Sequence, residues 1–249
     1  MDRYGLIGKN ISYSFSKQYF ASKFERERIT NASYVNFDCQ TIEEVVSYLL
    51  NPNIRGFNVT IPYKEAVIPY LDDLAPDAHA IGAVNTIKRT QTGDLIGYNT
   101  DFIGFKDSLT ERLGDALTTI PSPKKALILG TGGASKAVVF ALTTLGFSCM
   151  YVSRSPSEGV LSYQDLTASI VHSYTLIVNC TPLGTFPNIG AFPAIPYHEL
   201  RASHILYDLI YNPKKTVFLE KGEQQGAIII SGLRMLELQA EAAWEIWTA

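Results

Sequence analysis

The sequence contains few cysteines, and the three that it has, Cys39, Cys149 and Cys180, stand far apart. Their spacing includes no C-x-x-C pair, so it indicates neither a disulfide framework nor a zinc site, and we expect no bound metal. Positive charge is not in excess, since the net charge is −3. This charge argues against a nucleic-acid partner. No apolar run approaches a membrane span in length, and no signal peptide is evident. We therefore expect a cytoplasmic protein that does not bind membranes.

The chain does contain an alternation of strand-like and helix-like segments, and its 249 residues leave room for one large or two smaller domains. The continuous apolar segment 125–130 is typical of a strand inside a parallel sheet, and the order of the elements after it predicts a doubly wound α/β sheet. Residues 114–123 contain two prolines and no clear periodicity, which indicates a break near a domain boundary. Strands are predicted at 4–8, 32–39, 54–61, 83–89, 95–99, 125–130, 148–153, 175–180, 204–211 and 227–231, and helices at 17–28, 41–50, 74–81, 101–113, 136–145, 163–171, 216–225 and 232–247.

A lysine follows directly after one of the predicted strands. Residues 58–64 read NVTIPYK and end the apolar run 54–61. Pro62 cannot donate to a sheet ladder, so the strand must stop close to it, and Lys64 then lies just past its end. Substrates of open α/β sheets bind at that edge, although a lone lysine at a helix start is usually a surface residue. Asp101 opens a helix after the strand 95–99, where a helix cap alone would explain an aspartate.

Other polar residues stand where their type is unexpected. Asn85 lies within a predicted strand, where asparagine is unfavoured, so it needs a ligand or a special hydrogen bond. Gln239 lies on the apolar face of the last helix and is costly to bury unless it is hydrogen-bonded. Ser14 and Ser16 alternate, so an extended loop points both hydroxyls the same way, and an ordinary polar turn is the simpler interpretation.

A glycine-rich turn joins the strand 125–130 to the next helix. Its pattern is Gly130-x-Gly132-x-x-Ser135, with serine at the third position of G-x-G-x-x-G. Between a strand and a helix, such glycines let the backbone approach a pyrophosphate, and the helix N-terminus stabilises the negative charge. The pattern therefore predicts a dinucleotide site.

The end of the following strand indicates which dinucleotide binds. An NAD site usually places an acidic residue there, but this chain has Ser153, Arg154 and Ser155, and no acid before Glu158. Arg154 can take a 2′-phosphate through charge-assisted hydrogen bonds, with an exposed loop arginine as the alternative. The sequence therefore favours NADP.

Taken together, these motifs resemble the shikimate dehydrogenase family over essentially the whole chain. The matching motifs are Ser14-x-Ser16, Asn58-Val59-Thr60-x-Pro62-x-Lys64, Gly82-Ala83-Val84-Asn85-Thr86, Asn99-Thr100-Asp101, Gly130-x-Gly132-Gly133-Ala134-Ser135, Ser153-Arg154-Ser155, Asn179-x-Thr181-Pro182-x-Gly184, Asp208-x-x-Tyr211-Asn212-Pro213 and Met235-x-x-x-Gln239-Ala240.

The resemblance implies NADP-linked, reversible reduction of 3-dehydroshikimate to shikimate in aromatic amino-acid biosynthesis, by a monomer or homodimer. It also implies an α/β substrate domain at residues 1–101, completed by a C-terminal helix at 232–249, and a Rossmann-like NADP domain at 102–231. By the resemblance, Lys64 and Asp101 are the catalytic pair. The substrate residues are Ser14, Ser16, Asn58, Thr60, Asn85, Tyr211 and Gln239, and the cofactor residues are Gly130, Gly132, Gly133, Ala134, Ser135, Ser153, Arg154, Ser155, Thr181 and Gly232.

The chain departs from the family pattern at Phe102 and Ile103 after the aspartate, at Tyr13 before the serines and at Phe15 between them. Two alternatives remain open: a quinate/shikimate dehydrogenase that uses NAD, which Arg154 disfavours, and a non-catalytic NADP-sensing protein, which the presence of both Lys64 and Asp101 disfavours.

Overall fold

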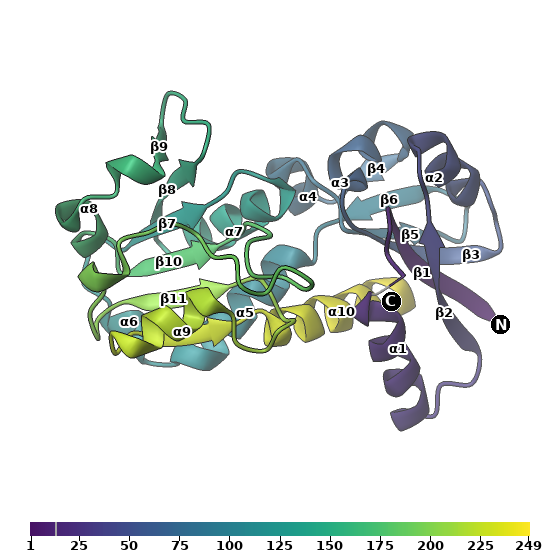
Figure 1. The fold of residues 1–249 in the computed structure, drawn as a ribbon. Helices are drawn as coiled ribbons and strands as arrows, with labels where there is room; N and C mark the ends of the chain where they lie inside the picture. The colour runs from purple at the N-terminus through teal and green to yellow at the C-terminus, as the bar shows by residue number, and fades with distance from the viewer. Residues whose placement is uncertain (13) are drawn as a thin grey trace. The chain divides into compact units, whose positions relative to one another are not determined.

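The computed structural model describes residues 1–12 and 14–249, which form two compact units (Figure 1). Unit 1 comprises Met1–Thr100 and Gln239–Ala249, and unit 2 comprises Asp101–Leu238. Each unit has a six-stranded sheet of its own, so the α/β fold class predicted from the sequence is confirmed. Of the helices that the structure describes, none combines the length and the apolar character that crossing a bilayer requires.

The sheet of unit 1 is mixed and has the strand order β2-β1-β3-β5-β6-β4. β1 pairs in parallel with β2 and β3, whereas β5 pairs antiparallel with β3 and β6. The strands are β1 (Asp2–Gly8), β2 (Ala32–Asp38), β3 (Ile54–Val59), β4 (Asp73–Leu74), β5 (Thr86–Arg89) and β6 (Leu95–Tyr98), and the helices are α1 (Phe15–Arg26), α2 (Ile42–Leu49), α3 (Tyr63–Ala66), η1 (Ile68–Tyr70) and α4 (Pro76–Ile81).

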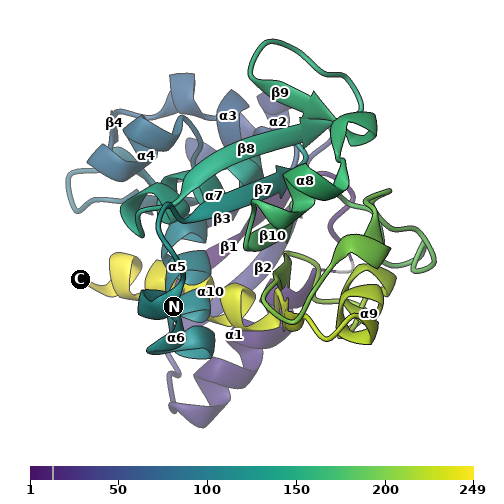
Figure 2. The same cartoon turned by 90° about the vertical axis from the view of Figure 1, so that its left-hand side faces the viewer.

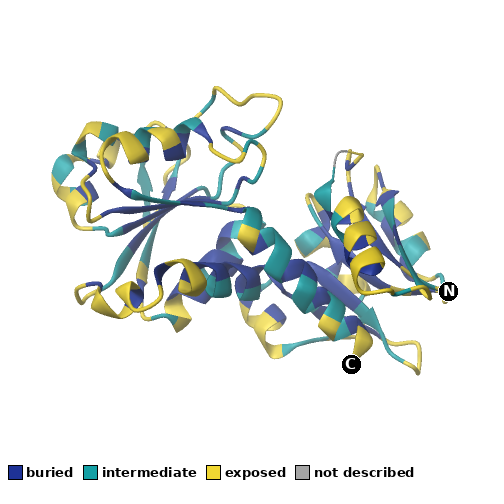
Figure 3. Ribbon diagram, turned by 90° about the horizontal axis from the view of Figure 1, so that it is seen from below, coloured by how far each residue is buried: buried dark blue, intermediate teal, exposed yellow. Residues whose placement is uncertain are grey.

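Alternating side chains along β1 supply two separate apolar clusters, since successive residues of a strand face opposite sides of the sheet. Ile7 belongs to a cluster with residues of α2 and α3. Tyr4 belongs to a second cluster with α1 and with α10 (Leu233–Thr248), whose Trp247 stacks on the Tyr4 ring at 4.9 Å. The strands are accordingly buried while outward helix faces are exposed (Figure 3). Gln239–Ala249 completes unit 1, which confirms that the last helix returns to it.

The sheet of unit 2 is entirely parallel, in the order β12-β11-β10-β7-β8-β9. Figure 2 labels four neighbouring strands of this sheet, β9, β8, β7 and β10. The chain runs from β7 outward to β9, crosses to β10 on the other side of β7, and then runs outward to β12. The strand order therefore reverses between β7 and β10, which is the switch point where such sheets bind ligands. The strands are β7 (Lys125–Leu129), β8 (Ser148–Ser153), β9 (Val160–Ser162), β10 (Leu176–Asn179), β11 (Ile205–Asp208) and β12 (Ile228–Ser231).

The central strands of this sheet, β7, β10 and β11, are buried and mostly apolar, which is typical of parallel strands covered by helices on both faces. α5 packs against α7, where Phe102 meets Phe140 edge to face at 5.1 Å. The departure from the family pattern at Phe102 is thus a packing residue of the helix pair. The helices of unit 2 are α5 (Asp101–Leu113), α6 (Ala116–Thr119), α7 (Gly133–Thr144), η2 (Tyr163–Asp165), α8 (Ala168–His172), η3 (Tyr197–Glu199), α9 (Val217–Gln224) and the first residues of α10.

Three short elements differ from the sequence prediction. The sequence predicts a helix from Leu74, but this residue belongs to the two-residue strand β4, and the helix begins at Pro76. The predicted helix 163–171 is a 3₁₀ turn followed by α8. The sequence does not predict the strand β9, because three residues are too few to show a period.

Candidate active site

The serine pair stands at the start of α1. Ser14 is the N-cap of this helix, and its hydroxyl accepts a hydrogen bond from the Ser16 backbone N–H at 3.3 Å. The Ser16 side chain is buried and lies near the Tyr34 hydroxyl, where it acts to lower the pKa of the phenol against the effect of burial. Ser14 therefore has the helix-capping role of an ordinary turn, while Ser16 joins a buried polar network. Tyr13, one of the departures from the family pattern, lies outside the described residues.

Tyr34, in β2, connects Ser16 to the strand that precedes the lysine. Its hydroxyl donates to Asn58 Oδ1 at 2.8 Å, and burial raises the pKa of the phenol. Asn58 in turn donates through Nδ2 to the Thr86 hydroxyl at 3.2 Å and to the Asn85 carbonyl at 3.4 Å. Both ends of the Asn58 amide are thus bonded within unit 1. Sequence reasoning missed Tyr34, because an alternating strand residue gives no sign of its partners.

Asn85 and Gln239 meet in the same network. Asn85 Oδ1 accepts from the Thr100 backbone N–H at 2.6 Å, and its Nδ2 donates to Thr100 Oγ1 at 3.0 Å and to Gln239 Oε1 at 3.4 Å. Both side chains are buried, with 3% and 8% exposed. The sequence predicts that Asn85 and Gln239 need hydrogen-bond partners. In the structure these partners are each other and Thr100.

Thr60 and Lys64 follow the end of β3. Thr60 turns the chain, since its carbonyl accepts from the Tyr63 backbone N–H at 2.9 Å, and its hydroxyl has no hydrogen-bond partner among the described residues. Lys64 lies in the short helix α3, and its carbonyl accepts from the Val84 backbone N–H at 2.8 Å, next to Asn85. Asp101 is the first residue of α5 and belongs to unit 2, where the helix dipole favours its negative charge.

The glycine-rich turn lies at the switch point of unit 2. Gly130 has φ +101°, and a Cβ on it would lie 3.1 Å from the Thr181 methyl group, so glycine is required both by its conformation and by the close approach of two loops. Gly132 is the N-cap of α7, faces open space and is followed by no acid in the first turn. Such a helix N-terminus fits a pyrophosphate. Gly133 and Ala134 form that first turn, whereas the Ser135 hydroxyl is buried and donates to the Gly132 carbonyl at 2.7 Å.

Arg154 stands just beyond β8. It is exposed, and within residues 1–12 and 14–249 it forms no ion pair or hydrogen bond. The flanking serines shape the turn, because the Ser155 backbone N–H donates to the Ser153 hydroxyl at 3.2 Å. The nearest acid along the chain, Glu158, is four residues away. A free guanidinium between two hydroxyls fits the extra phosphate that distinguishes NADP from NAD.

The remaining predicted residues, Thr181, Tyr211 and Gly232, follow β10, β11 and β12 at the carboxyl edge of the same sheet. Two polar residues that sequence reasoning left without a role end these strands: Asn179 and Asp208, which are register partners in β10 and β11. Both are fully buried. Burial raises the pKa of the Asp208 carboxyl to about 6, although hydrogen bonds to it act in the opposite direction.

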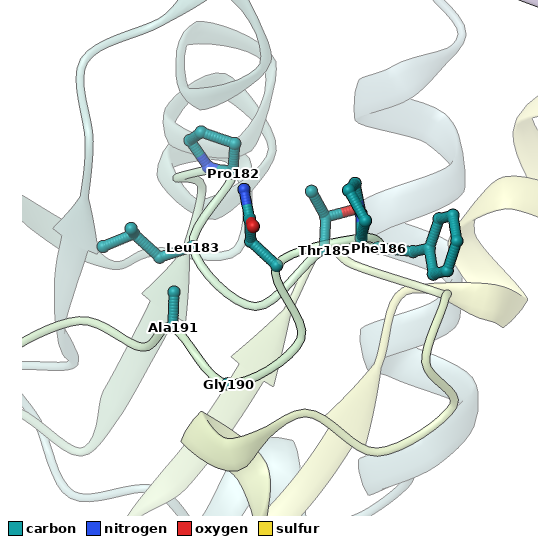
Figure 4. A pocket seen from close by; sticks show the side chains of 8 residues that line it. Pro182, Leu183, Thr185, Phe186, Gly190 and Ala191 are labelled. Carbon is teal, nitrogen blue, oxygen red and sulfur yellow. The ribbon is translucent and has the colours of Figure 1, made fainter.

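A cavity of about 520 Å³ lies in the loop that continues from Thr181 (Figure 4). Its lining is mostly apolar, and none of the predicted site residues belongs to it. The residues that line it are Pro182, Leu183, Thr185, Phe186, Pro187, Asn188, Gly190 and Ala191.

Comparison with known proteins gives consistent matches. A family model described as the shikimate dehydrogenase substrate binding domain matches residues 6–87. The chain is 37% identical over 260 residues to a shikimate dehydrogenase (NADP(+)) of Methanococcus maripaludis, covering 98% of this chain and 91% of that protein.

Two solved structures are similar over the full length. A shikimate dehydrogenase in complex with NADP+ has a TM-score of 0.88 and 34% identity, with 100% of this chain and 90% of the other covered. The enzyme of Thermus thermophilus, in complex with NADP(H) and shikimate, has a TM-score of 0.86 and 31% identity, with 100% and 94% covered.

Proposed function

Because this chain belongs to the shikimate dehydrogenase family, we propose that unit 1 binds the substrate and unit 2 binds the cofactor of one oxidoreductase reaction. The activity is that of an NADP-dependent shikimate dehydrogenase, which reversibly reduces 3-dehydroshikimate to shikimate in the pathway to aromatic amino acids. The two alternatives, an NAD-dependent enzyme and a non-catalytic sensor, are therefore set aside. The cytoplasmic location and the monomeric or dimeric state stay predictions.

The substrate side of the proposal rests on the polar network of unit 1. Ser16, Asn85 and Gln239 are buried within it, and the hydroxyl of Thr60 is left for a ligand. The segment 6–87, which contains most of these residues, is the part that the substrate-domain model matches. We assign to the whole set the binding of the substrate hydroxyls and carboxylate: Ser14, Ser16, Asn58, Thr60, Asn85, Tyr211 and Gln239.

The cofactor side rests on the switch point of unit 2, and this placement is the observation that carries the proposal. The turn 130–135 lies at the end of β7, beside Thr181 at the end of β10. Arg154 lies at the end of β8, the neighbour of β7. When bound, NADP supplies the hydride chemistry. The protein residues hold its pyrophosphate at the N-terminus of α7 and its 2′-phosphate at Arg154.

Lys64 and Asp101 are proposed to move and hold the proton. Reduction of the substrate carbonyl requires a proton at the oxygen, and the Lys64 ammonium donates it and takes it back in the reverse direction. The Asp101 carboxylate orients the ammonium and bonds a neighbouring substrate hydroxyl. A carboxylate beside the ammonium also favours its charged form.

Substitution of Lys64 tests the proton-transfer role. Lys64→Ala is expected to lower kcat with shikimate and NADP by about 10²- to 10⁴-fold, because a positioned acid/base is lost. The dissociation constant of NADP is expected to stay near that of the wild type. Lys88→Ala, which removes a lysine from β5, is the matched control and should keep kcat. Near-normal kcat with a raised KM in Lys64→Ala would make the lysine a substrate anchor instead.

Substitution of Arg154 tests the cofactor role. Arg154→Ala is expected to weaken NADP binding by roughly 10- to 100-fold and to leave NAD binding almost unchanged, since only NADP has the phosphate that the guanidinium contacts. Arg112→Ala, in the last turn of α5, is the matched control. Equal losses for NADP and NAD in a binding titration would exclude the 2′-phosphate role.

A further inference from the structure

Asp208 is fully buried, and its carboxylate accepts three hydrogen bonds. Its Oδ1 accepts from Asn179 Nδ2 at 3.0 Å and from the Ile210 backbone N–H at 3.1 Å, and its Oδ2 accepts from the Thr216 hydroxyl at 2.5 Å. No cation among the described residues pairs with it. Burying a carboxylate without a cation costs free energy. We therefore expect the hydrogen bonds of Asp208 to have a function of their own.

The first of these hydrogen bonds reaches the loop that follows β10. Asn179 accepts through Oδ1 from both the backbone N–H of Thr181, at 3.0 Å, and its hydroxyl, at 2.6 Å. The Thr181 hydroxyl then accepts from the Leu183 backbone N–H at 3.3 Å. Because Asp208 holds the other end of the Asn179 amide, it fixes which way that amide faces. The orientation of Thr181 therefore depends on Asp208 through one intervening side chain.

The second hydrogen bond shapes the loop that follows β11. The bond from the Ile210 backbone N–H closes a turn of the kind that aspartate side chains form with the backbone two residues on. This turn sets the direction in which the chain leaves the strand towards Tyr211. The third bond ties the far end of the same loop, since Thr216 is the N-cap of α9.

The loop that follows β12 is in direct backbone contact with this turn. The Gly232 N–H donates to the Ile210 carbonyl at 3.2 Å, and a Cβ on Gly232 would lie 2.2 Å from the Leu209 carbonyl oxygen. The segment 208–210 is thus held between the loop carrying Thr181 and the loop carrying Gly232.

We propose that Asp208 is a positioning residue for the reaction, which through Asn179 and the Ile210 turn holds Thr181 of the cofactor site and Tyr211 of the substrate site in one fixed arrangement. The inference rests on the roles proposed for Thr181 and Tyr211. A carboxylate suits the task because its two oxygens accept all three hydrogen bonds, two of them at Oδ1.

The test compares Asp208→Ala with Asp208→Asn by NADP titration and by steady-state kinetics with shikimate. Asp208→Ala is expected to raise both the NADP Kd and the shikimate KM by about tenfold or more, since acceptors of charge-assisted bonds are lost. Asp208→Asn keeps an oxygen towards Asn179 and Ile210 and is expected to restore both constants to within a few-fold of the wild type. Asp165→Asn, an exposed carboxylate of the same unit, is the matched control and should change neither.

A directional variant separates positioning from general support of the fold. Asn179→Ala cuts the connection to Thr181 and leaves the Ile210 turn intact, so it is expected to raise the NADP Kd more than the shikimate KM. Circular dichroism and thermal unfolding establish which variants fold. If Asp208→Ala does not fold, Asn179→Ala carries the test. Folded Asp208→Ala or Asn179→Ala with unchanged constants, or an equal effect of Asn179→Ala on both constants, would overturn the proposal.

Direct substitutions distinguish this result from a failure of the underlying assignments. Thr181→Val should weaken NADP binding, and Tyr211→Phe should raise the shikimate KM. If both act as expected while Asp208→Ala and Asn179→Ala behave as wild type, only the positioning role is wrong. If neither acts, the residues that Asp208 is proposed to position have no such roles, and the positioning proposal falls with them.

Discussion

The buried carboxylate of Asp208 should make the stability of this protein depend on pH in an unusual direction. Its pKa in the folded chain is about 6, against an ordinary value of 3.8. The folded state therefore binds this proton more tightly than the unfolded state, so the contribution of Asp208 to stability falls as pH rises from about 4 to about 6. A rise of about two units corresponds to about 3 kcal/mol of unfolding free energy, as an order of magnitude.

The assay is urea unfolding of the wild type and of Asp208→Asn between pH 4 and pH 8. The variant cannot ionise at this position. The unfolding free energy of Asp208→Asn minus that of the wild type should therefore increase by about 3 kcal/mol from the acid end to the neutral end of the range. Burial raises the pKa of the neighbouring Cys180 and Tyr197 as well, so both stay neutral throughout and do not contribute.

A carboxylate with the opposite shift is the control. Hydrogen bonds from Ser162 lower the pKa of Asp165. Its contribution to stability is therefore fully present above its ordinary pKa of 3.8 and is lost only as pH falls below that value, so the difference in unfolding free energy between Asp165→Asn and the wild type should stay nearly constant from pH 4 to pH 8. A difference between Asp208→Asn and the wild type that stays constant from pH 4 to pH 8 would refute the reasoning.

Two further predictions concern unit 1. Tyr34→Phe removes the donor to the buried Asn58 Oδ1, so it should lower the unfolding free energy by about 1–3 kcal/mol. It should also raise the shikimate KM. An unchanged KM would show that Tyr34 does not support the substrate site. Gly56→Ala places a Cβ 2.3 Å from Trp247 Nε1, so it should lower the unfolding free energy by about 1–3 kcal/mol. Gly190→Ala is the control and should change the unfolding free energy little, because the space around Gly190 is open. Equal melting temperatures for the two variants would contradict the packing argument.

Long periodic segments could be predicted from the sequence, and very short ones could not. The sequence predicts the helix at Asp101–Leu113 and the strand at Ser148–Ser153 with the bounds that the structure has, because the first repeats its apolar residues at helical spacing and the second contains a short apolar run. β4 has two residues, and its pairing with β6 depends on a partner more than twenty positions away along the chain. No local pattern records such a pairing.

The candidate site was predictable where function constrains a residue type within a motif. Gly130 and Arg154 stand next to strand ends, and the sequence shows both the strand and the residue. Asp208 stands in one of the motifs that carry the resemblance, but its role, like that of Tyr34, became visible only through a hydrogen bond to a residue of another strand, Asn179 for Asp208 and Asn58 for Tyr34. When a side chain acts through a partner that is distant along the chain, no local sequence pattern shows that action. The pairing of Lys64 with Asp101 stays a prediction.

The membership of α10 in both units has a consequence for biosynthesis. A ribosome releases the chain from its N-terminus at about 5–20 residues per second. Residues 1–100 therefore emerge long before Gln239–Ala249, which completes their unit. Until Trp247 arrives, Tyr4 and Phe20 lack the ring that closes their cluster. Unit 2 is continuous along the chain and has all its residues first. Unit 1, which contains residues 1–100, is thus the last one able to finish folding, and a nascent chain that stalls within α9 keeps those aromatic rings exposed to chaperones.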